Sequence, residues 1–125
     1  MRLQKFVLGP LNTNSYLVID KISSQCLIID PADDAELISE EILRQQLKLI
    51  AIIATHGHYD HIMAASALQL NFDSPFMVHA DDEFLVKDLA KRASFWQQRE
   101  IQLKPPKITD YLKPGQEIKF GKVFM

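Results

Sequence analysis

Short apolar runs separated by polar turns occupy the first part of the chain. Residues 3–8 form the first run, which ends at Gly9-Pro10, and residues 15–20 and 25–30 form two more. Runs of this length, rich in β-branched and aromatic residues and bounded by turn residues, predict β-strands. We therefore predict a hairpin-like start, with the second and third strands paired antiparallel.

Helical spacing replaces these runs after Pro31. Asp33 stands three residues before Glu36, as in a capping box, and apolar residues recur at helical intervals from 37 to 47. This pattern predicts an amphipathic helix that packs on a sheet. The unbroken apolar run over residues 49–54 that follows predicts a buried strand.

The alternation continues toward the C-terminus. We predict a helix over residues 60–70, a strand over residues 76–79 and a mostly helical segment over residues 83–103. Alternating strands and helices predict the α/β class. A closing hairpin is predicted over residues 116–125, turning at Gly121-Lys122. The bulky residues of the last helical segment are expected in the core: Phe84, Leu85, Leu89, Phe95 and Trp96.

The composition is that of one soluble globular domain, with 125 residues, 47% hydrophobic and 24% charged. A net charge of −2 with scattered basic residues offers no general attraction for nucleic acid. No apolar run reaches membrane-spanning length, and without a long apolar leader a cytoplasmic location is expected. Cys26 is the only cysteine and sits in an apolar run, so we expect a core residue rather than a nucleophile.

One polar turn carries most of the candidate chemistry. Residues 56–61 contain three of the four histidines and one carboxylate, directly after a predicted buried strand. In an extended segment, side chains two apart point the same way, so His56 and His58 are predicted to bind one metal ion. Asp60 and His61 follow at a predicted helix start and are predicted to bind a second, neighbouring ion. Carboxylate and imidazole donors suit Zn²⁺, Fe²⁺ or Mn²⁺.

Simpler roles exist for each of these residues. A lone histidine is usually an ordinary surface or core residue, and Asp60 could cap a helix. Four donors within six positions after a buried strand have few other uses, so the metal interpretation is favoured. His79 also follows a strand, but it stands alone beside an acidic helix start and is not expected to be a ligand.

The order His56-x-His58-x-Asp60-His61 after a hydrophobic strand resembles the signature of the metallo-β-lactamase superfamily. The surroundings are most similar to its glyoxalase II-like branch, the hydroxyacylglutathione hydrolases. That finer resemblance is carried by individually weak segments spread over nearly the whole chain: residues 11–18, 28–31, 104–106 and 113–115.

The resemblance implies a fold and an activity. The implied fold is the N-terminal half of an αββα sandwich, a mixed sheet with helices on its outer face. The implied activity is hydrolysis of a thioester such as S-lactoylglutathione by a hydroxide held between two zinc ions, with Asp60 orienting the nucleophile or handling its proton. Other esters and acyl compounds stay open as small-molecule substrates, and no nucleic acid or membrane partner is expected.

The family's remaining ligands, a third histidine, a bridging aspartate and a final histidine, come after the closing hairpin. We therefore expect residues 1–125 to be a domain that is incomplete at its C-terminus, with weaker metal binding and little hydrolase activity alone. The sheet face that carries Leu17, Ile28 and Ile52 is expected to pack against the missing half, so that a bare face leads to self-association. Two other functions stay open, a mononuclear-iron persulfide dioxygenase and a non-catalytic module.

Overall fold

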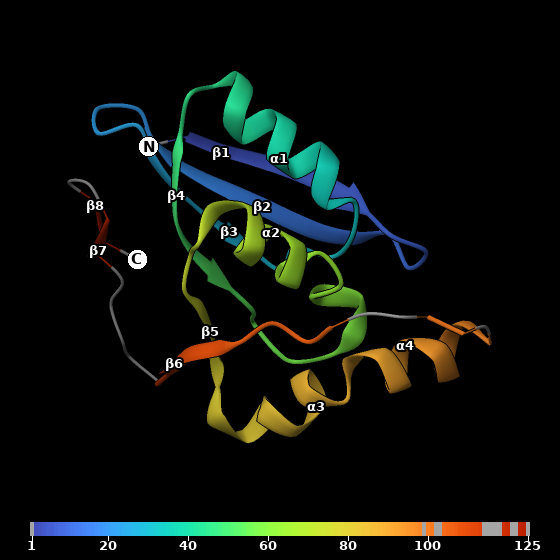
Figure 1. Ribbon diagram of the computed structural model, residues 1–125. Helices are drawn as coiled ribbons and strands as arrows, with labels where there is room; N and C mark the ends of the chain where they lie inside the picture. The colour runs from blue at the N-terminus through green and yellow to red at the C-terminus, as the bar shows by residue number, and fades with distance from the viewer. Residues whose placement is uncertain (1, 99, 102–103, 114–118, 121–122, 125) are drawn as a thin grey trace.

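Within residues 2–98, 100–101, 104–113, 119–120 and 123–124, which the computed structural model describes, six strands form one mixed sheet (Figure 1). In sheet order these are β1 (Arg2–Leu8), β2 (Thr13–Asp20), β3 (Gln25–Ile29), β4 (Lys48–Ile53), β5 (Phe76–His79) and β6 (Ile108–Leu112). β1, β2 and β3 pair antiparallel, and β3 to β6 run parallel. The predicted α/β class and the predicted antiparallel pairing of β2 with β3 are confirmed.

The helices pack on one face of this sheet. They are α1 (Ala35–Arg44), α2 (Ala65–Phe72), α3 (Glu83–Lys87) and α4 (Leu89–Gln97), with the short 3₁₀-helices η1 (Tyr59–His61) and η2 (Ala80–Asp82). α1 and α2 lie beside each other, as Figure 1 shows. Ile38, Leu68, Val86 and Leu89, one from each α-helix, join the apolar cluster of that face. Among the described residues, none of the helices has the length and apolar character that crossing a bilayer requires.

The two faces of the sheet carry different apolar sets. Leu17, Ile28 and Ile52 lie on the helix-covered face and are fully buried there, so the expectation that they face a missing half is wrong. The opposite face carries a second buried set: Val18, Leu27, Ala51, Ile53 and Met77. Side chains alternate between the faces, so where a strand is apolar on both sides its pattern does not say which set meets the helices.

The first helix and the closing hairpin are present with small differences. The N-cap of α1 lies one residue later than predicted, because Asp34 rather than Asp33 accepts a hydrogen bond from the Leu37 backbone nitrogen, at 3.2 Å. Near the C-terminus, β7 (Lys119–Phe120) pairs antiparallel with β8 (Val123–Phe124). The predicted turn at Gly121-Lys122 lies outside the described residues, as do residues 114–118.

The helix predicted over residues 60–70 begins only at Ala65. Asp60 and His61 instead lie in η1, where the His61 backbone nitrogen donates to the His58 carbonyl at 3.0 Å. Side-chain contacts of Asp60 with Thr13 and of His61 with the buried Asp30 hold this tight turn. Tertiary contacts therefore replace the first helical turn that the apolar spacing predicts.

The helical segment predicted over residues 83–103 is broken at Asp88 and ends at Gln97. Its predicted core residues divide into two groups. Leu85 and Leu89 are buried as expected. The core prediction is wrong for Phe84, Phe95 and Trp96, which are 57%, 72% and 65% exposed. Periodicity locates a helix, but it does not show which of its apolar residues reach the sheet.

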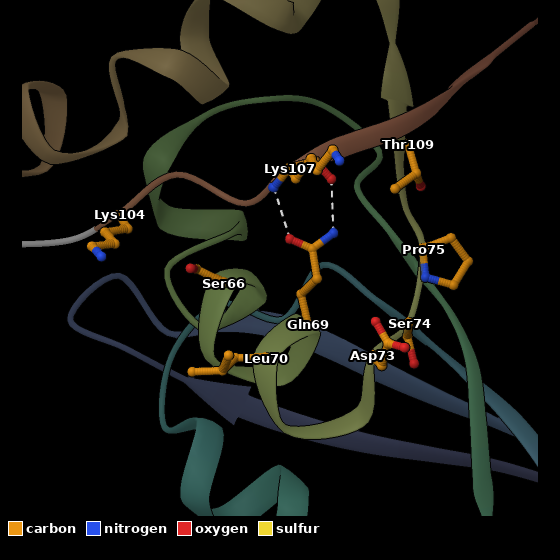
Figure 2. Close-up of a pocket in the computed structure, with 9 residues that line it drawn as sticks. All are labelled: Ser66, Gln69, Leu70, Asp73, Ser74, Pro75, Lys104, Lys107 and Thr109. Atoms are coloured by element: carbon orange, nitrogen blue, oxygen red, sulfur yellow. Dashed lines mark hydrogen bonds between the residues drawn. The ribbon is translucent and has the colours of Figure 1, made fainter.

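Strand β6 is not predicted by the sequence pattern. Its middle residues are exposed, so it lacks the apolar run of an interior strand. The chain entering β6 is held by Gln69 of α2, whose amide nitrogen donates to the Lys107 carbonyl and whose oxygen accepts from the Lys107 nitrogen, both at 2.7 Å (Figure 2). A cavity of about 640 Å³ lies beside this contact, and none of the four histidines lines it.

The buried thiol of Cys26 generates a prediction about alkaline pH. Burial raises the pKa of Cys26 from 9.0 to about 12, so the folded chain keeps the thiol neutral where the unfolded chain ionises it. This contribution to stability is complete below pH 9 and declines as the pH rises from 9 toward 12. Above pH 9 we expect it to fall increasingly steeply, approaching about 1.4 kcal/mol per pH unit near pH 10.5.

Urea unfolding of the natural chain and of Cys26→Ala over this pH range measures that contribution. The difference in unfolding free energy between the two chains should shrink as pH rises, because other groups titrate equally in both. A difference that stays constant would mean that the thiol ionises as readily in the folded state.

Candidate metal centre

Four strand ends meet at one edge of the sheet. The carboxyl ends of the parallel strands β3, β4 and β5 lie together, and β2, which is antiparallel to β3, begins at the same edge. Polar residues stand at each of these ends: Thr13, Asp30, residues 55–61 and Asp82. In α/β sheets this edge is where ligands commonly bind.

The four metal ligands predicted from the sequence lie together at this edge. The ring centroids of His56 and His58 are 4.6 Å apart, and those of His56 and His61 are 3.9 Å apart. His61 Nε2 lies 3.4 Å from Asp60 Oδ2. The extended turn after β4 presents the first two histidines, and η1 brings Asp60 and His61 back beside them.

The buried carboxylate of Asp30 organises this turn, and the histidine motif does not reveal it. Asp30 Oδ1 accepts from the Thr55 backbone nitrogen at 2.7 Å, while Oδ2 accepts from Thr55 Oγ1 at 2.7 Å and lies 3.0 Å from His61 Nδ1. The backbone of Asp30 is left-handed, with φ of 53°, a conformation that aspartate tolerates better than most residues. The available sequence signal is a carboxylate directly after a buried strand.

A second buried group holds the backbone on which Asp30 depends. The Ser15 hydroxyl donates to the Asp30 carbonyl and accepts from the Ala32 backbone nitrogen, the latter at 3.1 Å. Ser15 is fully buried within β2. Because one hydroxyl satisfies a donor and an acceptor on either side of Pro31, the chain can turn sharply after β3 without leaving buried polar groups unpaired.

The hydrogen bonds to Asp30 determine which imidazole nitrogens are free. An ionised carboxylate only accepts, so His61 carries its proton on Nδ1, which faces Asp30. The Thr55 hydroxyl gives its single proton to Asp30, so His56 Nδ1 donates at its 2.9 Å contact with Thr55 Oγ1. Both Nε2 atoms are thereby left with lone pairs, which is the state that binds a metal ion.

Electrostatics favour the neutral form of His56. Partial burial, and then the neighbouring His61 and His58, lower the pKa of His56 below its usual 6.5, against the opposing effect of Asp30 and Asp60. The imidazole is therefore neutral at pH 7, and protons compete with a metal ion only at lower pH.

The donor set fits a divalent cation in chemistry and in the spacing of one pair. Two ligands of a tetrahedral zinc ion lie roughly 3.3 Å apart when each bond is about 2.0–2.1 Å long, and His61 Nε2 and Asp60 Oδ2 are 3.4 Å apart. In the part of the chain that the structure describes, no three His, Cys, Asp or Glu side chains are grouped so that they could hold one ion together. The contacts between donors join two side chains at a time, with His56 beside His58 and His61, and His61 beside Asp60.

Two further polar residues have distinct positions. Thr13 Oγ1 donates to Asp60 Oδ2 at 3.3 Å, which links the start of β2 to the site and was not part of the sequence prediction. His79 turns away to a local role, because its Nδ1 accepts from the Asp81 backbone nitrogen at 3.1 Å and caps η2.

Relatives of the chain were found among curated proteins. It is 38% identical over 88 residues to an uncharacterized protein of Aquifex aeolicus, covering 70% of this chain and 41% of that protein. It is 31% identical over 94 residues to the probable metallo-hydrolase YqgX of Bacillus subtilis, covering 75% and 44%. A 63-residue match at 35% identity to a hydroxyacylglutathione hydrolase of Aeromonas hydrophila covers 50% and 24%. The chain spans less than half the length of each of these relatives.

Solved structures and the family comparison agree. The BLEG-1 B3 metallo-beta-lactamase superposes with a TM-score of 0.85 at 28% identity, covering 98% of this chain and 58% of that one. TTHA1623 in a di-iron-bound form superposes with a TM-score of 0.78 at 29% identity, covering 92% and 56%. Residues 8–124 match the Metallo-beta-lactamase superfamily, and the chain therefore belongs to that superfamily.

Proposed function

We propose that this chain supplies part of the dinuclear metal centre of a hydrolase that cleaves a thioester. The observation that carries the proposal is the gathering of His56, His58, Asp60 and His61 at one strand edge, with the Nε2 atoms of His56 and His61 left free. Bound zinc would lower the pKa of a water molecule toward neutrality and polarise the substrate carbonyl.

The chain's own residues have separable roles in this proposal. His56 and His58 bind one ion, and Asp60 and His61 bind its neighbour. Thr13 holds one carboxylate oxygen of Asp60 at 3.3 Å, which orients the carboxyl group toward the attacking water and its proton. Thr55 and Asp30 keep the imidazoles of His56 and His61 in the tautomers that bind metal.

The thioester substrate is supported by chemistry and by one partial relative. A thiolate leaves without needing a proton, so a site that supplies a nucleophile and a polarised carbonyl is sufficient. The Aeromonas hydrophila relative is named a hydroxyacylglutathione hydrolase. We propose a small-molecule acyl thioester as the substrate and a reducing compartment, such as the cytoplasm, as the location; self-association stays a prediction.

A second candidate function is oxidation at iron, as in persulfide dioxygenases. The observation behind it is TTHA1623, a similar structure described in a di-iron-bound form, which holds iron, although two ions rather than one. Metal content separates the two candidates when the product of the complete natural gene is purified without added metal. Zinc supports hydrolysis, whereas a single iron with oxygen consumption on persulfide addition supports the dioxygenase.

Zinc titration of the chain tests the metal centre itself. We expect His56→Ala, His58→Ala and His61→Ala each to weaken zinc binding by more than the roughly 10–100-fold that loss of an outer hydrogen-bond partner costs, because each removes a direct ligand. His79→Ala is the matched control, since His79 caps η2, and it should bind zinc like the unaltered chain. Equal zinc affinity in all four variants would contradict the metal centre.

Thiol release from S-lactoylglutathione tests the reaction. The product of the complete natural gene, loaded with zinc, should release thiol faster than it hydrolyses the matching oxygen ester, and Asp60→Asn should slow release by roughly 100-fold or more. Zinc content of the variant is measured alongside, so that lost metal is not mistaken for lost catalysis. If the zinc-loaded protein leaves the thioester intact but hydrolyses another acyl compound, the proposed thioester substrate is wrong.

Replacing Asp30 tests whether the buried carboxylate controls the site. Asparagine tolerates the same left-handed backbone, but it loses one acceptor for the protons of Thr55 and His61. We expect Asp30→Asn to weaken zinc binding roughly 10–100-fold and to lower the unfolding free energy by about 1–3 kcal/mol.

The control for this substitution is Asp73→Asn. Asp73 also has a left-handed backbone, with φ of 50°, and it is exposed at the end of α2. It should match the unaltered chain in zinc titration and in urea unfolding. Unchanged zinc affinity in Asp30→Asn would show that His61 is oriented by other contacts.

A further inference from the structure

Steric crowding explains why a glycine stands between His56 and His58. A Cβ at Gly57 would lie 2.8 Å from the Asp82 carbonyl oxygen and 3.0 Å from Leu85 Cβ. The first distance is too short for a side chain without movement of the backbone, and the second is tighter than nearly all real Cβ contacts. The turn that carries His56 and His58 therefore rests directly on the segment that follows β5.

A hydrogen bond joins the same two segments. The Gly57 backbone nitrogen donates to Asp82 Oδ2 at 3.0 Å. Asp82 occupies the N-cap position of α3, where an aspartate ordinarily accepts from the first backbone N–H groups of its own helix. Its side chain makes no such capping bond. The Asp82 carboxylate therefore binds the histidine turn after β4 and does not cap its own helix.

Asp82 stands on an anchored segment. Leu85 and Val86, in the helix that begins directly after it, are buried, Val86 completely. On the other side, β5 is held to β4 by a hydrogen bond from the Ala54 nitrogen to the Met77 carbonyl, at 3.0 Å. The position of Asp82 relative to the histidine turn is therefore determined by strand pairing and core packing.

We propose, on the basis of the proposed function, that Asp82 is a positioning residue of the metal centre. The Gly57 peptide lies between His56 and His58, so any rotation of that peptide moves both imidazoles. The Asp82 carboxylate holds its N–H group in one direction, and an ionised acceptor makes this bond stronger than a neutral one. Asp82 acts on the histidines through the backbone and not as a ligand.

Two measurements on Asp82→Ala test this role. Zinc binding should weaken roughly 10–100-fold, the effect of losing a partner that orients a ligand. Hydrogen exchange at the Gly57 amide of the metal-free chain should accelerate by roughly tenfold or more, as loss of a hydrogen bond to a charged group requires. Asp82→Asn keeps an acceptor oxygen and should restore most of both properties. If Asp82→Ala does not fold, Asp82→Ser replaces it, because serine suits an N-cap position.

The control is Asp81→Ala, because the neighbouring Asp81 side chain is 88% exposed. This variant should match the unaltered chain in both measurements. Unchanged zinc affinity and unchanged Gly57 exchange in Asp82→Ala would overturn the positioning role, as would equal losses in the alanine and asparagine variants. Failure of the unaltered chain to bind zinc would contradict the proposed function instead, while Gly57 exchange would still report on the Asp82 contact.

Discussion

The carboxylate of Asp30 connects the framework of this domain to its chemistry. It is buried at the end of β3, and its two oxygens bind the backbone and hydroxyl of Thr55 and the ring of His61. A buried charge of this kind is costly unless every lone pair finds a donor. Because the donors to Asp30 come from the end of β4 and from η1, these two segments lie close together. The histidines that they carry are therefore also close together.

The second constraint is the crowding of strand ends at one edge. Parallel pairing of β3, β4 and β5 places their carboxyl ends side by side, and the two strands that flank β4 lead to residues that support the turn after it. Asp30 binds it from β3, while Asp82 reaches it from the segment after β5. Such supports orient donor atoms before any ion arrives, which reduces the ordering that metal binding must impose. The site is therefore built mostly by neighbours that are distant in sequence.

The exposed aromatic residues show that helical spacing alone does not predict which side chains are buried. Phe95 and Trp96 lie on α4 at spacing that is compatible with a core face, yet their rings pack on each other at 5.3 Å and stay largely in solvent. Leu89 and Ala93 of the same helix reach the core instead. The angle at which a helix meets a sheet decides which of its apolar residues are covered, and no spacing rule contains that angle.

Strand and helix alternation, the buried strand before the histidines and the burial of Cys26 follow from the sequence itself, because they depend on local periodicity and apolar character. His56, His58, Asp60 and His61 could be predicted as candidate ligands from the sequence, since they lie within six consecutive positions. Asp30, Thr13 and Asp82 were not, because their partners are 25 to 47 residues away in the sequence.

The individual separations make the reason plain. Asp30 and Thr55 are 25 residues apart, as are Gly57 and Asp82, and Thr13 and Asp60 are 47 apart. Tertiary structure also decided which face of the sheet the helices cover and that a strand forms at β6. A hydrogen bond between distant segments exists only once strand order and register have brought its donor and acceptor together, so tertiary structure alone determined the supports of the site, while the sequence by itself predicted its candidate ligands.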